Sequence, residues 1–264
     1  MTPILMLGAG RMGGAVLEGW RRAGAFKPAE LMIRDPQPSA AAKAAAREGA
    51  KLNPKDALLA EAKTVLLSVK PQLWRAVAAE TASWLALDAV VISVAAGVTS
   101  QDLRREFGGR LVARVMPTTA AAIGQGTASL YADDPAALVR AHALFEPLGT
   151  VVDLTDEAQM HAATAVSGSG PAYLYALIES LEAAGVAVGL PTSEAARLAR
   201  STLTGAAALL AEAGADPAEL RRQVSSPGGT TEAALNVLLG EHGLPSLMRE
   251  AVIRAVRRSK ELGA

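Results

Sequence analysis

The stretch Ile4-Leu5-Met6-Leu7-Gly8-Ala9-Gly10-Arg11-Met12-Gly13 decides the fold of this 264-residue chain. Its four apolar residues predict a buried strand, and its glycines match the pattern G-x-G-x-x-G directly before a segment with helical spacing. Between a strand and a helix, such glycines allow a tight turn, a close approach of the backbone to a pyrophosphate, and close helix–strand packing. The stretch therefore predicts a dinucleotide-binding loop; the alternative is a plain glycine turn in a helix–sheet domain.

The first half of the chain alternates short apolar runs with longer segments of helical composition. Several runs are continuously apolar, which is typical of strands buried on both faces of a parallel sheet. We therefore expect an α/β Rossmann domain over residues 1–156, with a doubly wound, mostly parallel sheet. The predicted strands are residues 4–7, 31–34, 65–68, 90–94, 111–115 and 151–154.

The second half, residues 157–264, has a different composition. Its β-branched runs stop, and Ala- and Leu-rich segments with helical spacing alternate with Gly and Pro. We expect an all-α domain whose first long helix begins at Pro171, because proline suits the first helical turn. Roughly 100 residues of helix form only a small core by themselves. Together with the Ala-rich face over Leu203–Leu210, this predicts a helical interface between two subunits.

Composition removes several classes of partner and chemistry. Lys and Arg total 26, as do Asp and Glu, so the chain lacks the basic excess that nucleic acid or an anionic membrane surface attracts. It has no Cys, and its three His show no metal-ligand spacing, so we expect no metal site. The N-terminus is unlike a signal peptide, and no apolar run reaches the length of a membrane span. The sequence thus predicts a cytoplasmic protein that binds neither nucleic acid nor membrane.

Arg34 and Asp35 end the second predicted strand, where Rossmann domains select their cofactor. The Arg34 guanidinium can bind the 2′-phosphate of NADPH, whereas the Asp35 carboxylate suits the ribose 2′-hydroxyl of NADH. Because Arg34 lies nearer the strand, we expect NADPH as the cofactor, with NADH as the alternative. A solvated ion pair between Arg34 and Asp35 is the purely structural interpretation.

Small residues and prolines follow other predicted strands, at Val69-Lys70-Pro71, Ala95-Ala96-Gly97 and Met116-Pro117. Open α/β sheets bind ligands at that edge, and small residues there let a flat nicotinamide lie against the backbone. Each segment alone is more typical of a tight strand-to-helix turn. Lys70 is a weak candidate for a proton donor, because a lysine before proline also suits the backbone geometry or a surface ion pair.

Two segments of the helical half are rich in glycine and hydroxyl groups. Ser167-Gly168-Ser169-Gly170-Pro171-Ala172-Tyr173 and Ser225-Ser226-Pro227-Gly228-Gly229-Thr230-Thr231-Glu232 each precede a predicted helix. Free N–H groups at a helix start, with Ser or Thr hydroxyls, form a neutral binding site for a small carboxylate. Simple helix capping is the alternative for either segment. Finding two such segments favours a binding site.

In this order and over essentially the whole chain, these motifs resemble the pyrroline-5-carboxylate reductase family. The motif Ser167–Tyr173 and the motif Ser226–Thr231 are the specific ones, whereas the N-terminal glycine pattern is shared by many dehydrogenases. The resemblance implies a Rossmann domain, a helical C-terminal dimerisation domain, and in many members a decamer of five dimers. It also implies reduction of 1-pyrroline-5-carboxylate, a cyclic imino acid, to L-proline in the last step of proline biosynthesis.

The resemblance also assigns the site residues. It implies that Thr231 is catalytic, with its hydroxyl beside the ring nitrogen of the substrate. The residues implied to bind substrate are Ser226, Gly228, Gly229, Thr230 and Thr231. The glycine motif, the end of the second strand and the resemblance together assign cofactor binding to Leu7, Gly8, Ala9, Gly10, Arg11, Met12, Arg34, Val69, Lys70, Pro71, Ala95, Ala96 and Gly97.

One segment departs from the family pattern. Met116-Pro117-Thr118-Thr119-Ala120 stands where the family commonly has Met-Pro-Asn-Thr-Pro. Because Thr118 offers no amide, it cannot supply both the donor and the acceptor of an asparagine side chain.

The chemistry of a cyclic imine agrees with such a site. The imine is readily protonated to an electrophilic iminium, so its reduction depends more on the placement of a hydride donor than on a strong acid. Two alternatives stay open at this point. A β-hydroxyacid dehydrogenase shares the plan but needs a helix-borne lysine, and none occurs between Asp156 and Glu194. A dinucleotide-sensing module without turnover would keep the same fold.

Overall fold

The computed structural model describes residues 1–261, which form two compact units. The first unit comprises Met1–Gly168 together with the end of the last helix from Ala255, and the second comprises Ser169–Arg254. The composition of the sequence changes earlier, at residue 156. The structural boundary lies later because Met160 and Ala165, which follow that point, are buried within the first unit. The last three residues of the predicted helical domain, 262–264, lie outside the described residues.

The first unit is built on an eight-stranded sheet with the order β3-β2-β1-β4-β5-β6-β7-β8. Only the β6–β7 pair is antiparallel, which confirms the mostly parallel sheet. Two strands escape the sequence prediction, β3 and β7, and the other bounds differ from it by at most a few residues. The strands are β1 Ile4–Leu7, β2 Leu31–Arg34, β3 Lys51–Leu52, β4 Thr64–Leu67, β5 Val90–Ser93, β6 Val112–Pro117, β7 Gly126–Tyr131 and β8 Gly149–Asp153.

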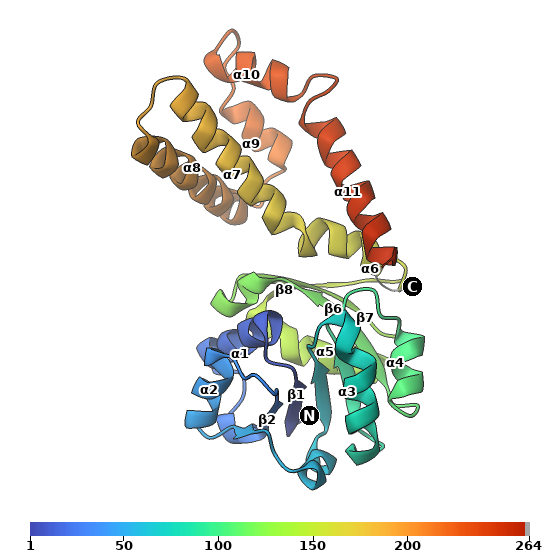
Figure 1. The fold of residues 1–264 in the computed structure, drawn as a ribbon. Helices are drawn as coiled ribbons and strands as arrows, with labels where there is room; N and C mark the ends of the chain where they lie inside the picture. The colour runs from blue at the N-terminus through green and yellow to red at the C-terminus, as the bar shows by residue number, and fades with distance from the viewer. Residues whose placement is uncertain (262–264) are drawn as a thin grey trace. The chain divides into compact units, whose positions relative to one another are not determined.

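Helices cover both faces of this sheet (Figure 1). Successive residues of a strand point to opposite faces, so Ile4 and Met6 of β1 pack on one side and Leu5 and Leu7 on the other. The first side packs against α1, α2 and α5, and the second against α3 and α4. The helices of this unit are α1 Arg11–Ala23, α2 Ala40–Arg47, α3 Trp74–Thr81, α4 Ser100–Glu106, α5 Pro135–Phe145 and α6 Gln159–Ala163.

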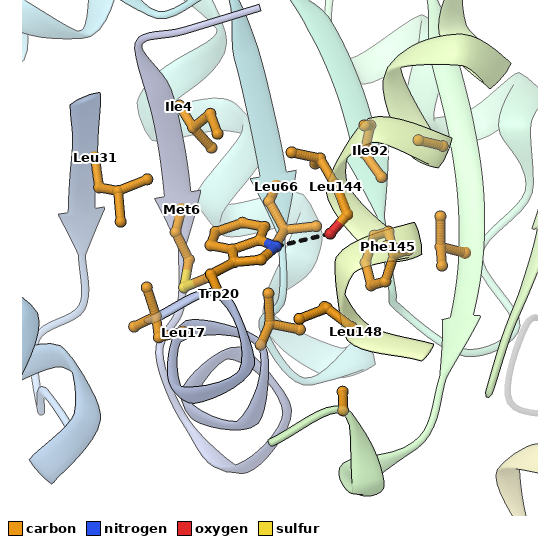
Figure 2. Close-up of a cluster of buried hydrophobic side chains, with 14 of the residues drawn as sticks. Ile4, Met6, Leu17, Trp20, Leu31, Leu66, Ile92, Leu144, Phe145 and Leu148 are labelled. Carbon is orange, nitrogen blue, oxygen red and sulfur yellow. Dashed lines mark hydrogen bonds between the residues drawn. The ribbon is translucent and has the colours of Figure 1, made fainter. Parts of the chain in front are cut away.

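Trp20 is the largest side chain of the core under α1 and α5 (Figure 2). It is 1% exposed, and its indole N–H donates to the carbonyl of Leu144 at 2.7 Å. This hydrogen bond satisfies the one polar atom of a buried ring. It therefore fixes α1, which begins at the glycine-rich loop, to α5 at the opposite end of the sequence of this unit.

The second unit is entirely helical, as predicted. The helix expected from Pro171 begins one residue earlier, at Gly170, after a π-helical turn over Thr164–Gly168. The helices are α7 Gly170–Ala187, α8 Thr192–Ala213, α9 Pro217–Gln223, α10 Thr230–Leu238 and α11 Leu244–Glu261, of which the last ends in the first unit. In the described part of the chain, no helix combines the length and the apolar composition that crossing a membrane requires.

The second unit buries little of its apolar surface. Only Ala195 and Ala199 are fully buried between Ser169 and Arg254. Large apolar side chains are exposed on α7, α8 and α11, among them Leu174, Leu177, Leu181, Leu198, Leu209 and Ile253. Exposed apolar surface of this extent marks an interaction surface in a folded protein.

Candidate active site

The sheet has its topological switch point between β1 and β4, where the chain order reverses. Leu7 at the end of β1 pairs with Leu67 at the end of β4, which in turn pairs with Ser93 at the end of β5. The loops that follow these strands therefore leave the same edge side by side. Open α/β sheets bind their ligands at this edge. The structure thus brings together the three loops whose residues are predicted to bind the cofactor.

Glycine is required at two positions of the G-x-G-x-x-G motif, Gly8 in the loop and Gly13 in α1. Gly8 has φ +89°, and a Cβ atom there would lie 2.7 Å from Cγ1 of Val69. A Cβ atom on Gly13 would collide with the carbonyl of Gly8 and lie 2.9 Å from Oγ of Ser68. By contrast, a Cβ atom on Gly10 would have nothing within 4 Å. The loop is therefore tightly packed against the sheet and α1, while Gly10 faces open space.

The start of α1 offers free backbone donors. Gly10 is its N-cap and provides no side-chain cap, and the first turn holds no acidic residue. Within residues 1–261, the N–H groups of Arg11, Met12 and Gly13 have no hydrogen-bond partner. A helix N-terminus with free N–H groups is an anion-binding site. These donors fit the pyrophosphate of a dinucleotide. The N–H of Ala9 is not among them, because it donates to Oδ2 of Asp35 at 2.5 Å.

The two charged residues at the end of β2 do not pair with each other. Arg34 forms an ion pair with Asp56, the first residue of the 3₁₀ helix Asp56–Glu61. Asp35 is buried and accepts from the backbone of Ala9 and, at 2.7 Å, of Gln37. The structural alternative of a solvated Arg34–Asp35 pair is therefore wrong. Sequence reasoning missed Asp56, because no local pattern links it to β2.

The loops after β4 and β5 are predicted to line the nicotinamide. Lys70 is exposed and caps the 3₁₀ helix Pro71–Leu73, while Val69 is half-buried beside Gly8. In the next loop Ala95 is buried and its N–H donates to Oγ of Ser93 at 3.2 Å, and Gly97 has φ +79°. Both loops are thus short and held close to the strand ends.

A partly buried ion pair fixes the far end of the loop after β5. Arg114 of β6 donates to Glu157 at 2.9 Å, and Glu157 accepts from both the backbone N–H and the hydroxyl of Ser100, at 2.6 and 2.7 Å. Ser100 is the first residue of α4. The carboxylate therefore ties α4 and β6 together directly after Gly97. Sequence reasoning did not identify Glu157, because its partners are 57 and 43 residues away.

Thr118 is buried and has a defined structural role. Its hydroxyl accepts from the backbone N–H of Thr127 at 3.0 Å. This hydrogen bond connects the end of β6 to β7. The residue that departs from the family pattern therefore uses its oxygen as an acceptor within the fold.

The segment Ser226–Glu232 lies in the second unit, at the start of α10. The N–H of Gly228 donates to the carboxylate of Glu232 at 2.7 Å, and the N–H of Gly229 donates to the carbonyl of Ser226 at 3.0 Å. The free donors are instead the N–H groups of Thr230, Thr231 and Glu232, since residues 1–261 contain no partner for them. The predicted anion site thus has free N–H groups, but they begin at Thr230, directly after the two glycines.

The other glycine-rich segment, Ser167–Tyr173, spans the start of α7. The hydroxyl of Ser167 donates to the carbonyl of Ala163 at 2.9 Å within the π-helical turn. The hydroxyl of Tyr173 is buried and has no hydrogen-bond partner in the described residues. The backbone N–H of Ala172 in this segment donates to the carbonyl of Ser169 at 3.0 Å.

Each half of the chain matches a known protein family. Residues 157–262 match the family model for the pyrroline-5-carboxylate reductase dimerisation domain, and residues 3–97 match that for the coenzyme F420-dependent NADP oxidoreductases. The pyrroline-5-carboxylate reductase of Pseudomonas aeruginosa is 39% identical, with 99% of this chain and 97% of that protein covered.

Solved structures give the same result. The pyrroline-5-carboxylate reductase of Coxiella burnetii superposes with a TM-score of 0.90 at 29% identity, covering 100% of this chain and 99% of that one. The pyrroline carboxylate reductase of Plasmodium falciparum, solved with NADP bound, has a TM-score of 0.85 at 24% identity, covering 100% and 98%. The extent and level of this similarity place the chain in the pyrroline-5-carboxylate reductase family.

Proposed function

We propose that this chain reduces 1-pyrroline-5-carboxylate to L-proline with NADPH, the last step of proline biosynthesis. The observation that carries the proposal is the match of the whole chain to reductases of that name, at 39% identity in the P. aeruginosa relative. The two sets of free backbone donors, at the start of α1 and of α10, are consistent with it. One suits a pyrophosphate and the other a small carboxylate.

The residues of the chain then have the following roles. The cofactor supplies the hydride when it is bound. The N–H groups at the start of α1 hold its pyrophosphate, and the loops at Val69-Lys70-Pro71 and Ala95-Ala96-Gly97 place its nicotinamide. The free N–H groups at Thr230, Thr231 and Glu232 bind the substrate carboxylate together with the Ser226 hydroxyl. Gly228 and Gly229 serve this site by shaping the turn, since their own N–H groups are already bonded.

Thr231 is the proposed catalytic residue. Its hydroxyl orients the ring nitrogen and stabilises the proton there, so that the adjacent carbon accepts the hydride. A protonated imine needs little further activation, and positioning alone supplies a large part of the rate. This explains how a family member without Cys, and with only three His in its sequence, carries out the reduction.

NADPH is the proposed cofactor, with NADH as the alternative. The NADP bound to the P. falciparum relative supports this choice, as does the NADP-dependent family model over residues 3–97. In this chain, Arg34 at the end of β2 is the cation proposed to bind the 2′-phosphate.

We further propose a homodimer formed through the helical domain, and a decamer of five such dimers as the complete assembly. The exposed apolar side chains of α7, α8 and α11 support the dimer, as does the dimerisation-domain match over residues 157–262. Light scattering coupled to size-exclusion chromatography distinguishes monomer, dimer and decamer. The cytoplasmic location remains a prediction from the sequence.

The test of the reaction is NADPH oxidation in the presence of 1-pyrroline-5-carboxylate. We expect Thr231→Ala to lower kcat, Thr231→Ser to restore most of it, and Ser226→Ala mainly to raise the substrate KM. Ser225→Ala is the matched control, because the Ser225 hydroxyl donates to the carbonyl of Arg221 at 2.7 Å. Wild-type kinetics in Thr231→Ala would refute the catalytic role. Cofactor binding without any turnover would favour the dinucleotide-sensing module.

A further inference from the structure

The guanidinium that a 2′-phosphate would need is already engaged. Arg34 pairs with Asp56, and the two side chains are 30% and 45% exposed. The neighbouring Asp35 carboxylate is 8% exposed and accepts two backbone N–H groups. The end of β2 therefore places one cation beside two carboxylates.

The loop that carries Asp56 is held firmly at this position. Asn53, at φ +47°, donates from its side chain to the carbonyl of Asp35 and accepts from the N–H of Asp35, both at 2.9 Å. Its own N–H donates to the carbonyl of Ile33 at 2.7 Å. Three hydrogen bonds made by Asn53 thus join the segment before Asp56 to the end of β2.

This arrangement affects NADPH and NADH differently. The ribose of a dinucleotide lies at the end of the second strand of a Rossmann sheet. A 2′-phosphate there must draw the Arg34 guanidinium away from Asp56, or share it, while facing the charge of Asp35. A 2′-hydroxyl has no such requirement and can donate to a carboxylate. Asp56 therefore disfavours the binding of NADPH, the cofactor that carries the 2′-phosphate.

We propose that Asp56 is a specificity-determining residue that competes with the 2′-phosphate for Arg34 and so narrows the preference for NADPH over NADH. The inference rests on the proposed function, because it takes the nucleotide site at the end of β2 as the cofactor site. It assigns to Asp56 a role through Arg34, with no contact to the reacting atoms.

The test is Asp56→Asn, which removes the charge and keeps the shape. Calorimetric titration measures the binding of NADPH, NADH, adenosine 2′,5′-bisphosphate and AMP to the intact protein. We expect the Kd of both 2′-phosphorylated ligands to fall on the order of 3–10-fold, as a partly exposed ion pair allows. The Kd of NADH and AMP should change less than about twofold, and the gain should shrink at high salt.

Two further variants separate this explanation from a general charge effect. Glu61→Gln is the matched control, since Glu61 ends the same 3₁₀ helix but pairs with Lys51 at 3.2 Å. An equal gain in that variant would overturn the inference. Asp56→Asn in an Arg34→Ala background should bring no gain, and a gain there would also overturn it. An unchanged ratio of NADPH to NADH affinity in Asp56→Asn refutes the inference alone, whereas a wild type that binds neither dinucleotide refutes the proposed function.

Discussion

Replacing Glu157 by alanine would leave the Arg114 guanidinium buried without its carboxylate. The Arg114 side chain is 4% exposed and that of Glu157 is 25% exposed, and their atoms are 2.9 Å apart. The substitution also removes the acceptor for the N–H and the hydroxyl of Ser100. One carboxylate therefore satisfies three donors, on β6 and at the start of α4.

The magnitude follows from this geometry. Breaking a fully buried ion pair by removing one partner costs about 3–5 kcal/mol. Because Glu157 is a quarter exposed, water can reach part of the vacated space and reduce the cost to about 2 kcal/mol. Loss of the acceptor at the start of α4 adds about 1 kcal/mol. We therefore expect Glu157→Ala to destabilise the protein by about 3 kcal/mol, a fall in Tm on the order of 6–12 °C.

Thermal melting followed by circular dichroism measures this fall, at matched protein concentration because the protein is expected to be a dimer. Glu157→Gln keeps one acceptor oxygen, so its loss of stability should be roughly half that of Glu157→Ala. Glu18→Ala is the control, since Glu18 is an exposed α1 residue whose side chain makes no hydrogen bond or ion pair in the described residues. A fall in Tm of less than about 2 °C in Glu157→Ala would refute the reasoning, since it would mean that water satisfies Arg114 fully.

Two predictions concern other parts of the first unit. Gly13→Ala should weaken NADPH binding at least about tenfold and lower Tm, because the new Cβ would collide with a backbone carbonyl of the same loop. Gly10→Ala should melt like the wild type, and an equal loss of Tm in the two variants would contradict this. Burial opposes protonation of His142, but hydrogen bonds to Glu146 and Asp153 at 2.8 Å outweigh it and raise the pKa of His142. The stability that protonated His142 gains from these two carboxylates is fully present below the ordinary pKa of histidine. It is lost as the pH rises through the raised pKa. The Tm difference between wild type and His142→Gln should thus be larger at pH 5.5 than at pH 8.5, and an equal difference would disprove the pairing.

The continuous apolar runs predicted the parallel part of the sheet because those strands are buried on both faces. β1, β4 and β5 are fully buried along their length. β7, Gly126–Tyr131, was missed because its Thr and Ser residues interrupt the apolar pattern and its antiparallel pairing depends on β6. β3 has only two residues, Lys51–Leu52, which is too short for any period to be recognised.

The glycine positions of the candidate site could also be predicted, because the positive φ of Gly8 and the close approach of Gly13 to the Gly8 carbonyl are requirements within the motif itself. The hydrogen-bond partners could not. The Asp35 carboxylate accepts from the N–H of Ala9 because β1 lies beside β2. Arg34 pairs with Asp56, which lies after β3. Sequence pattern therefore locates an anion site more readily than it predicts how selective that site is.

In the roles proposed above, affinity and selectivity depend on different groups of this chain. The donors proposed for pyrophosphate and carboxylate are backbone N–H groups in the first turns of α1 and α10, fixed by the helices themselves. Such donors act at short range on whichever anion is bound, and a side-chain substitution does not remove them. The proposed contacts to the 2′-position instead involve Arg34, Asp35 and Asp56, whose charges can each be changed by one substitution. We therefore expect substitutions of these three side chains to change the cofactor preference, and the ability to bind a dinucleotide to depend on the backbone.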